Sequence, residues 1–196
     1  MSINDRLFSY TEELVNHSLK SINLNPVFSL LKNAYENNKF VAVCGNGGSA
    51  AISDHFVCDH VKGIGSDTAY KPFIISLNSN VPLMTAISND IGYEFVFSKQ
   101  IELMKNNFGV VIIISSSGNS PNVIEALKYC SDFNIKTIAL VGFDGGKILK
   151  NNMADYILHV KSNNYGIVED AHQIVMHVIA QEIRQSYAHT PHNLKL

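Results

Sequence analysis

The sequence predicts an α/β fold in which a doubly wound, five-stranded parallel sheet follows two N-terminal helices. Five short apolar runs alternate with segments of helical periodicity, and we expect them to be the strands: 40–44, 72–77, 110–114, 136–141 and 156–160. The run at 110–114, VVIII, is apolar at every position, which is typical of a strand buried on both faces of a parallel sheet. Strands that alternate with helices along one chain form a parallel sheet with helices on both of its faces.

The spacing of apolar residues between the strands predicts helices at 50–62, 82–88, 94–106, 122–130 and 167–186, with a loop at 63–71 and a turn at 143–146. Two more helices, 4–21 and 26–38, precede the first strand, so they are not crossovers of the sheet. We expect them to pack against the sheet or against another subunit. The prediction is a single domain, 1–196, made of an N-terminal helical pair (1–38), an α/β core (39–188) and a polar tail (189–196).

The composition is that of an ordinary globular protein. Of 196 residues, 46% are hydrophobic and 16% are charged, and the net charge of -2 argues against a broad surface for nucleic acid. The three cysteines, Cys44, Cys58 and Cys130, are odd in number and form no CxxC pair. This pattern favours a reducing cytosol over a disulfide framework. The polar residues 2–5 predict no secretory signal, and no apolar run approaches the roughly 20 residues that cross a bilayer. We therefore expect a cytoplasmic protein without a membrane partner.

A serine-rich segment, 115–120 (SSSGNS), follows the strand predicted at 110–114 and precedes Pro121, a good first residue of a helix. Its hydroxyls and backbone N–H groups therefore gather between the end of a strand and the start of a helix. This geometry binds anions and suits phosphate. No GxxxxGK[ST] motif is present, so a nucleoside triphosphatase loop is disfavoured. The alternative is a polar loop that binds no ligand.

A glycine-rich segment, 45–49 (GNGGS), ends the strand predicted at 40–44, and its glycines allow positive φ and a close approach of the backbone to a ligand. It lacks the GxGxxG spacing and the acidic residue of a dinucleotide site. Both this segment and the serine-rich segment follow the carboxyl ends of strands, where ligands bind in parallel sheets. We expect them to share one crevice.

Two helices carry residues that could do chemistry. His55 and Asp59 lie four residues apart on one helical face, so they could bind a metal or form an acid–base pair; the alternative is a polar surface. On the C-terminal helix, His172 and His177 are about 140° apart around the axis and cannot easily serve one site. His177 lies about 20° from Asp170 and about 80° from Glu169, so helix geometry alone favours Asp170 as its partner. The pair Asn89 and Asp90 ends a helix, either as a turn or as a site that recognises hydroxyls.

Taken together, these motifs resemble the sugar isomerase (SIS) domain family, and within it the phosphoheptose isomerases. The resemblance covers nearly the whole chain. It rests on GNGGS at 45–49 with His55, TAISND at 85–90 with GYE at 92–94, SSSGNS at 115–120 with Asn122, the glycine pair 145–146, and EDAH at 169–172 with His177.

The resemblance implies a flavodoxin-like three-layer sandwich and an aldose–ketose isomerase. The implied reaction converts sedoheptulose 7-phosphate to D-glycero-D-manno-heptose 7-phosphate, which supplies nucleotide-activated heptose for lipopolysaccharide and other surface polysaccharides. It also implies a homotetramer with active sites between subunits, and often zinc. The alternative within the family is a non-catalytic SIS protein, either a sugar-phosphate sensor or a tetramer that associates with the replication initiator.

The resemblance further implies roles for particular residues. The substrate would be bound by Asn46, Gly47, Gly48, Ser49, Asn89, Asp90, Ser115, Ser116, Ser117, Ser120 and Glu169. Zinc or another divalent metal would be held by His55, Asp59, Glu169 and His177, of which Asp59, Glu169 and His177 would also be catalytic. This mapping selects Glu169 over Asp170. Asp59 stands where the family usually has glutamate, Glu169 stands where it usually has glutamine, and the loop at 62–71 lacks the usual arginine.

Overall fold

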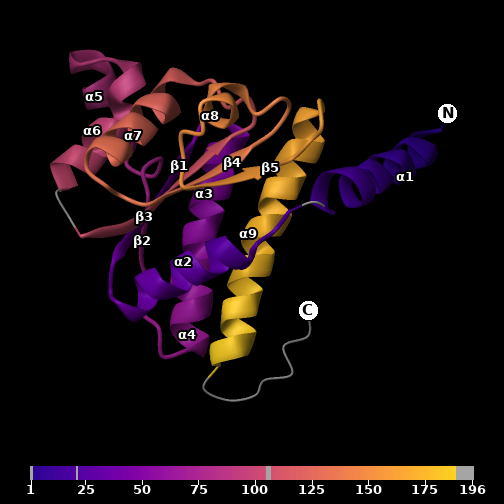
Figure 1. The fold of residues 1–196 in the computed structure, drawn as a ribbon, viewed down its shortest axis with the longest axis horizontal. Helices are drawn as coiled ribbons and strands as arrows, with labels where there is room; N and C mark the ends of the chain where they lie inside the picture. Colours follow the sequence, from indigo (N-terminus) through magenta and orange to yellow (C-terminus); the bar gives the residue numbers. More distant parts are fainter. Residues whose placement is uncertain (1, 21, 105–106, 189–196) are drawn as a thin grey trace.

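The computed structural model describes residues 2–20, 22–104 and 107–188, and a five-stranded parallel sheet forms its centre (Figure 1). The strands are β1 (Phe40–Gly45), β2 (Phe73–Ser76), β3 (Phe108–Ser115), β4 (Thr137–Val141) and β5 (Tyr156–His159). They lie in the order β2-β1-β3-β4-β5, and all neighbouring pairs are parallel. The predicted doubly wound sheet is confirmed, and each strand ends within about two residues of its expected position.

The helices cover both faces of the sheet. They are α1 (Ile3–Glu13), α2 (Asn25–Glu36), α3 (Gly48–Cys58), α4 (Gly65–Asp67), α5 (Val81–Asp90), α6 (Val96–Met104), α7 (Pro121–Asp132), α8 (Gly146–Lys150) and α9 (Tyr165–Tyr187). Alternate residues of the strands point to opposite faces, so Val43 and Ile112 pack with α2, α3 and α9, whereas Cys44 and Ile113 pack with α5, α6 and α7. The result is the expected three-layer sandwich.

The strand order reverses direction beside β1, because β2 lies on one side of it and β3 on the other. In open parallel sheets the crevice for a ligand forms at such a switch point, outside the carboxyl ends of the strands. Gly45 at the end of β1 is paired with Ile114 near the end of β3. The glycine-rich and serine-rich segments therefore emerge from the sheet side by side.

Two segments differ from the sequence-based expectation. The loop expected at 63–71 begins instead with a π-helical turn, η2 (Asp59–Ile64), and the short helix α4. The guanidinium group of Arg184, on α9, bonds the carboxylate of Asp67 at 2.5 and 2.7 Å, and its side chain lies over Gly63. This contact joins the segment to a distant part of the chain, which local sequence patterns do not report. The turn expected at 143–146 leads into α8, a helix of five residues that the sequence analysis did not predict.

The expected N-terminal helical pair is present, with α1 continued by a π-helical turn, η1 (Leu14–Leu19), before α2. The helix α1 stands away from the body of the domain (Figure 1). Hydrogen bonds tie it to the rest of the domain: the Tyr10 hydroxyl donates to Asp170 at 2.7 Å, and the Ser162 hydroxyl donates to Glu13 at 2.7 Å. The predicted polar tail, 189–196, lies outside the described residues. Among the helices that are described, none has the length and hydropathy needed to span a membrane.

Candidate active site

A cavity of about 290 Å³ opens at the carboxyl ends of β1 and β3. It is lined by Asn46, Gly47, Gly48, Ser49, Ile114, Ser115, Ser116, Ser117, Ser120, Tyr165 and Glu169. The glycine-rich and serine-rich segments thus share one crevice, as predicted from their positions at the ends of strands. Of the residues expected to bind substrate, Asn89 and Asp90 do not line it.

The serine-rich wall of this cavity presents hydroxyls and a helix N-terminus. Ser115 and Ser116 are buried, and Ser120 occupies the position that caps α7, a helix of 12 residues. Within the described part of the chain, the Ser120 side chain makes no capping hydrogen bond to the helix, so its hydroxyl is available to a ligand. The N-terminus of a helix carries partial positive charge and free N–H groups. This wall therefore suits an anion such as phosphate.

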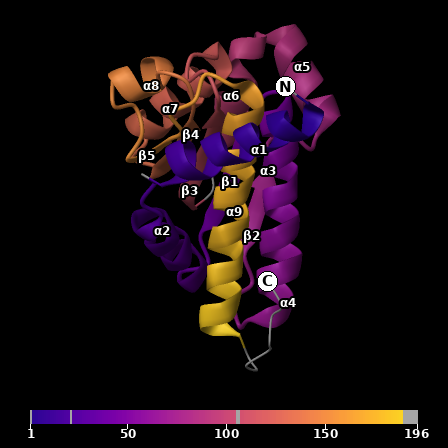
Figure 2. The same ribbon diagram turned by 90° about the vertical axis from the view of Figure 1, so that its right-hand side faces the viewer.

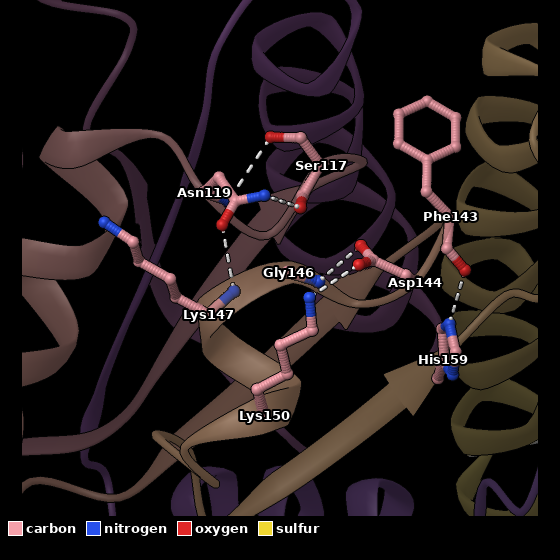
Figure 3. A network of polar contacts seen from close by, with 8 residues as sticks. All are labelled: Ser117, Asn119, Phe143, Asp144, Gly146, Lys147, Lys150 and His159. Carbon is pink, nitrogen blue, oxygen red and sulfur yellow. Dashed lines mark hydrogen bonds and ion pairs between the residues drawn. The ribbon is translucent and has the colours of Figure 1, made fainter.

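Close backbone contacts with the start of α8 shape the serine-rich segment (Figure 3). Gly118 and Gly146 both have positive φ, and a Cβ at Gly146 would collide with the carbonyl oxygen of Ser117. The Asn119 amide donates to the Ser117 carbonyl at 2.9 Å and accepts from the Lys147 backbone N–H at 2.9 Å. Glycine is needed here because two backbone segments pass within van der Waals contact.

The turn before α8 is held by its own polar contacts (Figure 3). The Asp144 carboxylate accepts from the Gly146 N–H at 3.1 Å and from the Lys150 ammonium at 2.7 Å, and these bonds lower the pKa of Asp144. A ring nitrogen of His159 lies 2.9 Å from the carbonyl oxygen of Phe143. The turn that packs against the serine-rich segment is thus itself held by hydrogen bonds.

On the glycine-rich side, the Asn46 and Asn122 side-chain amides form two reciprocal hydrogen bonds of 2.9 Å, and the Tyr93 hydroxyl donates to Asn46 at 2.9 Å. A second cavity, of about 520 Å³, adjoins the first through Asn46 and Gly47 and is also lined by Ser88 of α5. The positioning role of Tyr93 was not predicted. Its only sequence signal is its place in the GYE motif.

Glu169 reaches into the first cavity from α9. Gly48 makes room for it, since a Cβ at this position would lie 2.6 Å from the Glu169 Oε2 atom. The glutamate carboxylate therefore lies against the N-terminal turn of α3. Its neighbour Asp170 faces the other way and accepts a hydrogen bond from Tyr10. The geometric preference for Asp170 as the partner of His177 is wrong, because contact with α1 turns this carboxylate away.

Further along α3 and α9, which lie side by side in Figure 2, three side chains converge. The Asp59 carboxylate lies 3.4 Å from His55 Nε2 through one oxygen and 3.5 Å from His177 Nε2 through the other. One ligand atom from each of the three lies within 4.8 Å of the others. The sequence found His55 and Asp59 by their spacing, and the fold brings His177 to them. We call these three residues the His/Asp cluster.

Two imidazole nitrogens and a carboxylate are a donor set that zinc accepts. The cluster is also accessible, since the His55 side chain is 48% exposed. The residues present therefore fit a divalent cation. Glu169, the fourth metal ligand implied by the resemblance, does not belong to the cluster in the described structure. A different residue, Gln173, places its amide nitrogen 3.0 Å from His177 Nε2.

Asn89, Asp90 and His172 are not among the described residues that line the first cavity or form the His/Asp cluster. Asn89 and Asp90 are exposed at the end of α5, where the Asn89 amide donates to Asp90 at 2.8 Å. His172 of α9 is fully buried, and its Nε2 atom lies 3.4 Å from the Val141 carbonyl oxygen. Burial lowers the pKa of His172 to about 4. The two histidines of α9 therefore do not share a site, as the helix geometry predicted.

The comparisons with known proteins agree with this site. The profile of the SIS domain family matches residues 9–142. A phosphoheptose isomerase of Helicobacter pylori strain P12 is 35% identical over 187 residues, which are 91% of this chain and 92% of that protein. This chain belongs to the SIS domain family, with the phosphoheptose isomerases. Its fold also matches a phosphoheptose isomerase structure from Francisella tularensis, with TM-score 0.81, 28% identity, and 94% and 100% of the two chains covered. The structure of a phosphoheptose isomerase from Neisseria gonorrhoeae also matches, with TM-score 0.79 and 29% identity. The match covers 93% of this chain and 98% of that one.

Proposed function

We propose that this SIS protein is a phosphoheptose isomerase that interconverts sedoheptulose 7-phosphate and D-glycero-D-manno-heptose 7-phosphate. The observation that carries the proposal is the alignment of an anion-binding cavity with the His/Asp cluster along the same two helices. Seven residues separate Gly48 from His55, a rise of about 10 Å along the helix axis. An extended seven-carbon sugar phosphate is of similar length. In this proposal the reaction supplies activated heptose for the synthesis of lipopolysaccharide.

In this proposal the serine-rich wall holds the phosphate. The hydroxyls of Ser115, Ser116 and Ser120 and the N-terminus of α7 bind it without a positively charged side chain. Because the phosphate is remote from the reacting carbons, its binding energy orients the sugar chain toward the His/Asp cluster. Glu169, in the same cavity, accepts hydrogen bonds from sugar hydroxyls.

Isomerisation breaks the C1–H bond of the ketose and forms the C2–H bond of the aldose, while a hydroxyl proton moves from O1 to O2. A carboxylate must carry the carbon-bound proton. Of the two candidates, Asp59 belongs to the cluster toward which the sugar chain points, whereas Glu169 lies about 12 Å along α9 from His177, in the cavity that would hold the phosphate. We therefore assign the base to Asp59, with Glu169 as the alternative. His55, Asp59 and His177 would hold a divalent cation such as zinc, which makes the carbon-bound proton more acidic by polarising the sugar oxygens.

We also propose a homotetramer whose sites lie between subunits. The helix α1 supports this, since none of the residues Ile3–Glu13 is buried and the side chains of Ile3, Leu7 and Phe8 are 60–78% exposed. Large apolar residues exposed together commonly mark an interface. The partly exposed His/Asp cluster is likewise open to cover by another subunit.

Deuterium exchange tests the function directly. The purified protein is incubated with sedoheptulose 7-phosphate in deuterated water, with zinc and with a chelator. We expect deuterium at C1 of the ketose and C2 of the aldose with zinc, and little with the chelator. Tight binding of the sugar phosphate without deuterium uptake would instead favour a non-catalytic SIS protein, an alternative that has no support among the named relatives. Glu169→Gln and Asp59→Asn, tested singly, identify the base, and the proposal is wrong if neither slows the exchange.

A further inference from the structure

Tyr165 is an aromatic residue in the wall of the first cavity. It is the first residue of α9, and it is 62% exposed. Glu169, which lines the same cavity, follows four residues later, so both side chains point to the same side of the helix. The first turn of α9 thus brings a phenol into a cavity that otherwise consists of small hydroxyls, backbone and one carboxylate.

The position of Tyr165 along α9 places it at the phosphate end of the cavity. Its distance from His177 along the helix axis is about 18 Å, whereas Glu169 is about 12 Å from the same histidine. A substrate that extends from the His/Asp cluster to the serine-rich wall can therefore reach Tyr165 only with its phosphate group. The phenol and the serine hydroxyls are in reach of the same anion.

Phe143 contacts the ring of Tyr165. The two ring centroids are 4.6 Å apart and the planes meet at 89°, which is the edge-to-face arrangement that aromatic pairs favour. Phe143 follows Gly142, whose backbone N–H donates to the Ser116 carbonyl at 2.9 Å. The chain that carries Phe143 is therefore bonded to the serine-rich wall on one side and contacts Tyr165 on the other.

The backbone of Phe143 has a left-handed conformation, with φ of 49°. The other non-glycine residues with positive φ in the described part of the chain are asparagines, which tolerate it, whereas a bulky side chain is strained there. The Phe143 N–H donates to the Ser162 carbonyl at 3.1 Å, and its carbonyl oxygen lies 2.9 Å from a His159 ring nitrogen, on the side away from the phenyl ring (Figure 3). Strain of this kind often occurs at functional sites. Here it sets the direction of the phenyl ring.

We propose that Tyr165 is a substrate-binding residue whose hydroxyl donates a hydrogen bond to the phosphate group, and that Phe143 is the positioning residue that orients its ring. The inference rests on the proposed function, in that it presumes a sugar phosphate in the first cavity. A hydrogen bond to a charged oxygen is stronger than one between neutral groups, and the ring shields that side of the phosphate from water. Tyr165 then supplies a donor to a site without a positively charged side chain.

The test uses the full-length protein, titrated with inorganic phosphate by calorimetry and assayed with sedoheptulose 7-phosphate. Tyr165→Phe removes only the hydroxyl. We expect it to weaken phosphate binding by about tenfold, the lower range for loss of a hydrogen bond to a charged group. The KM for the sugar phosphate should rise by a similar factor, with kcat within about twofold. Tyr156→Phe is the matched control, since Tyr156 of β5 is not among the described residues that line this cavity, and it should leave phosphate binding unchanged.

A double-mutant cycle tests the positioning role of Phe143. Phe143→Leu keeps an apolar side chain but removes the aromatic pair, and we expect it to weaken phosphate binding by about threefold. In a Tyr165→Ala background, Phe143→Leu should cause no further loss, because the ring through which it acts is absent. An equal loss in both backgrounds would show that Phe143 has a general structural role, and this part of the inference would be wrong.

The outcomes separate the inference from the proposed function. If Tyr165→Phe leaves phosphate affinity unchanged, or lowers kcat at a native KM, Tyr165 does not bind the phosphate and the inference is wrong. If Tyr165→Phe weakens phosphate binding but the native protein incorporates no deuterium, the inference stands and the isomerase proposal fails. Failure of the native protein to bind inorganic phosphate or the sugar phosphate overturns the inference. Thermal unfolding of each variant verifies that it is folded.

Discussion

The cavity and the His/Asp cluster are built in different ways, although they lie along the same two helices. The cavity consists of loops at the ends of β1 and β3, and much of its surface is backbone and small hydroxyl side chains. The cluster consists of side chains from three elements, His55 of α3, Asp59 at the start of η2 and His177 of α9, and the first two are more than 100 residues from His177 in the sequence. The cavity is therefore a property of local sequence, and the cluster is a property of how two helices pack.

This difference predicts a division of labour. Loop groups that surround the phosphate contact it equally in the ground state and in the transition state, so their loss raises KM. Groups at the reacting carbons act mainly in the transition state, so their loss lowers kcat. Substitutions in the two regions should separate these parameters.

The largest effect is expected in the cluster. Asp59→Asn removes the one carboxylate of the His/Asp cluster, and we expect kcat to fall by about 10³-fold, within the range for loss of an acid–base group. The KM for the sugar phosphate should change by less than about threefold, because the cavity is intact. Steady-state kinetics with added zinc measures both. A large rise in KM with a native kcat would contradict the division between the two regions.

A smaller effect is expected where the cavity meets Glu169. A Cβ at Gly48 would lie 2.6 Å from the Glu169 carboxylate, so Gly48→Ala should push this side chain aside. Because alanine is favoured over glycine in a helix, thermal stability should be native or higher, while kcat falls by about 10- to 100-fold through misplacement of the carboxylate. Kinetics and thermal unfolding on one preparation test this combination.

Gly65→Ala is the matched control, since its Cβ would have only the Pro72 ring near it, at 3.9 Å. It makes the same chemical change in another helix and should leave both activity and stability near the native values. A loss of stability in Gly48→Ala comparable to its loss of activity would show that the helix itself, not Glu169, is disturbed.

The same contrast explains how much could be predicted from the sequence. Apolar runs identified the strands, and the residue types at their ends identified the cavity, because those signals are local. Gln173 carried no such signal, since an amide on a helix surface is ordinary until His177 and Asp59 are seen beside it. Helix geometry also misjudged Asp170, because the contact that turns it away comes from Tyr10, 160 positions earlier in the chain.

A buried histidine of α9, His172, predicts that the stability of the protein depends on pH. The folded protein binds a proton on His172 only below about pH 4, whereas the unfolded chain binds it below its ordinary pKa of 6.5. Between these values the unfolded state holds more protons, so stability falls as the pH falls, by up to about 1.4 kcal/mol per pH unit for this group. His60, whose pKa burial lowers to about 3, acts in the same direction.

Urea denaturation at pH 6.5, 5.5 and 4.5 measures how the free energy of unfolding depends on pH. His172→Gln should reduce this slope by the amount that corresponds to about one bound proton. The result would also sharpen the comparison, because activity lost in acid could then be divided between unfolding and the site. An unchanged slope in His172→Gln would mean that this histidine is not buried in its neutral form.

The smallest effect is expected in the loop that supports the cavity wall. Asn119→Ala removes the bonds to the Ser117 carbonyl and the Lys147 N–H, each of 2.9 Å, at a cost of about 1 kcal/mol of net stability per bond or less because Asn119 is exposed. A serine-rich segment that is less well held should raise KM by about fivefold and leave kcat unchanged. Lys150→Ala is the control, since it deletes only the exposed ion pair with Asp144 in the same network, and such pairs contribute little. If Asn119→Ala lowered kcat and left KM alone, the serine-rich segment would act on the reacting carbons rather than on the phosphate, and the two regions would not be separate in function.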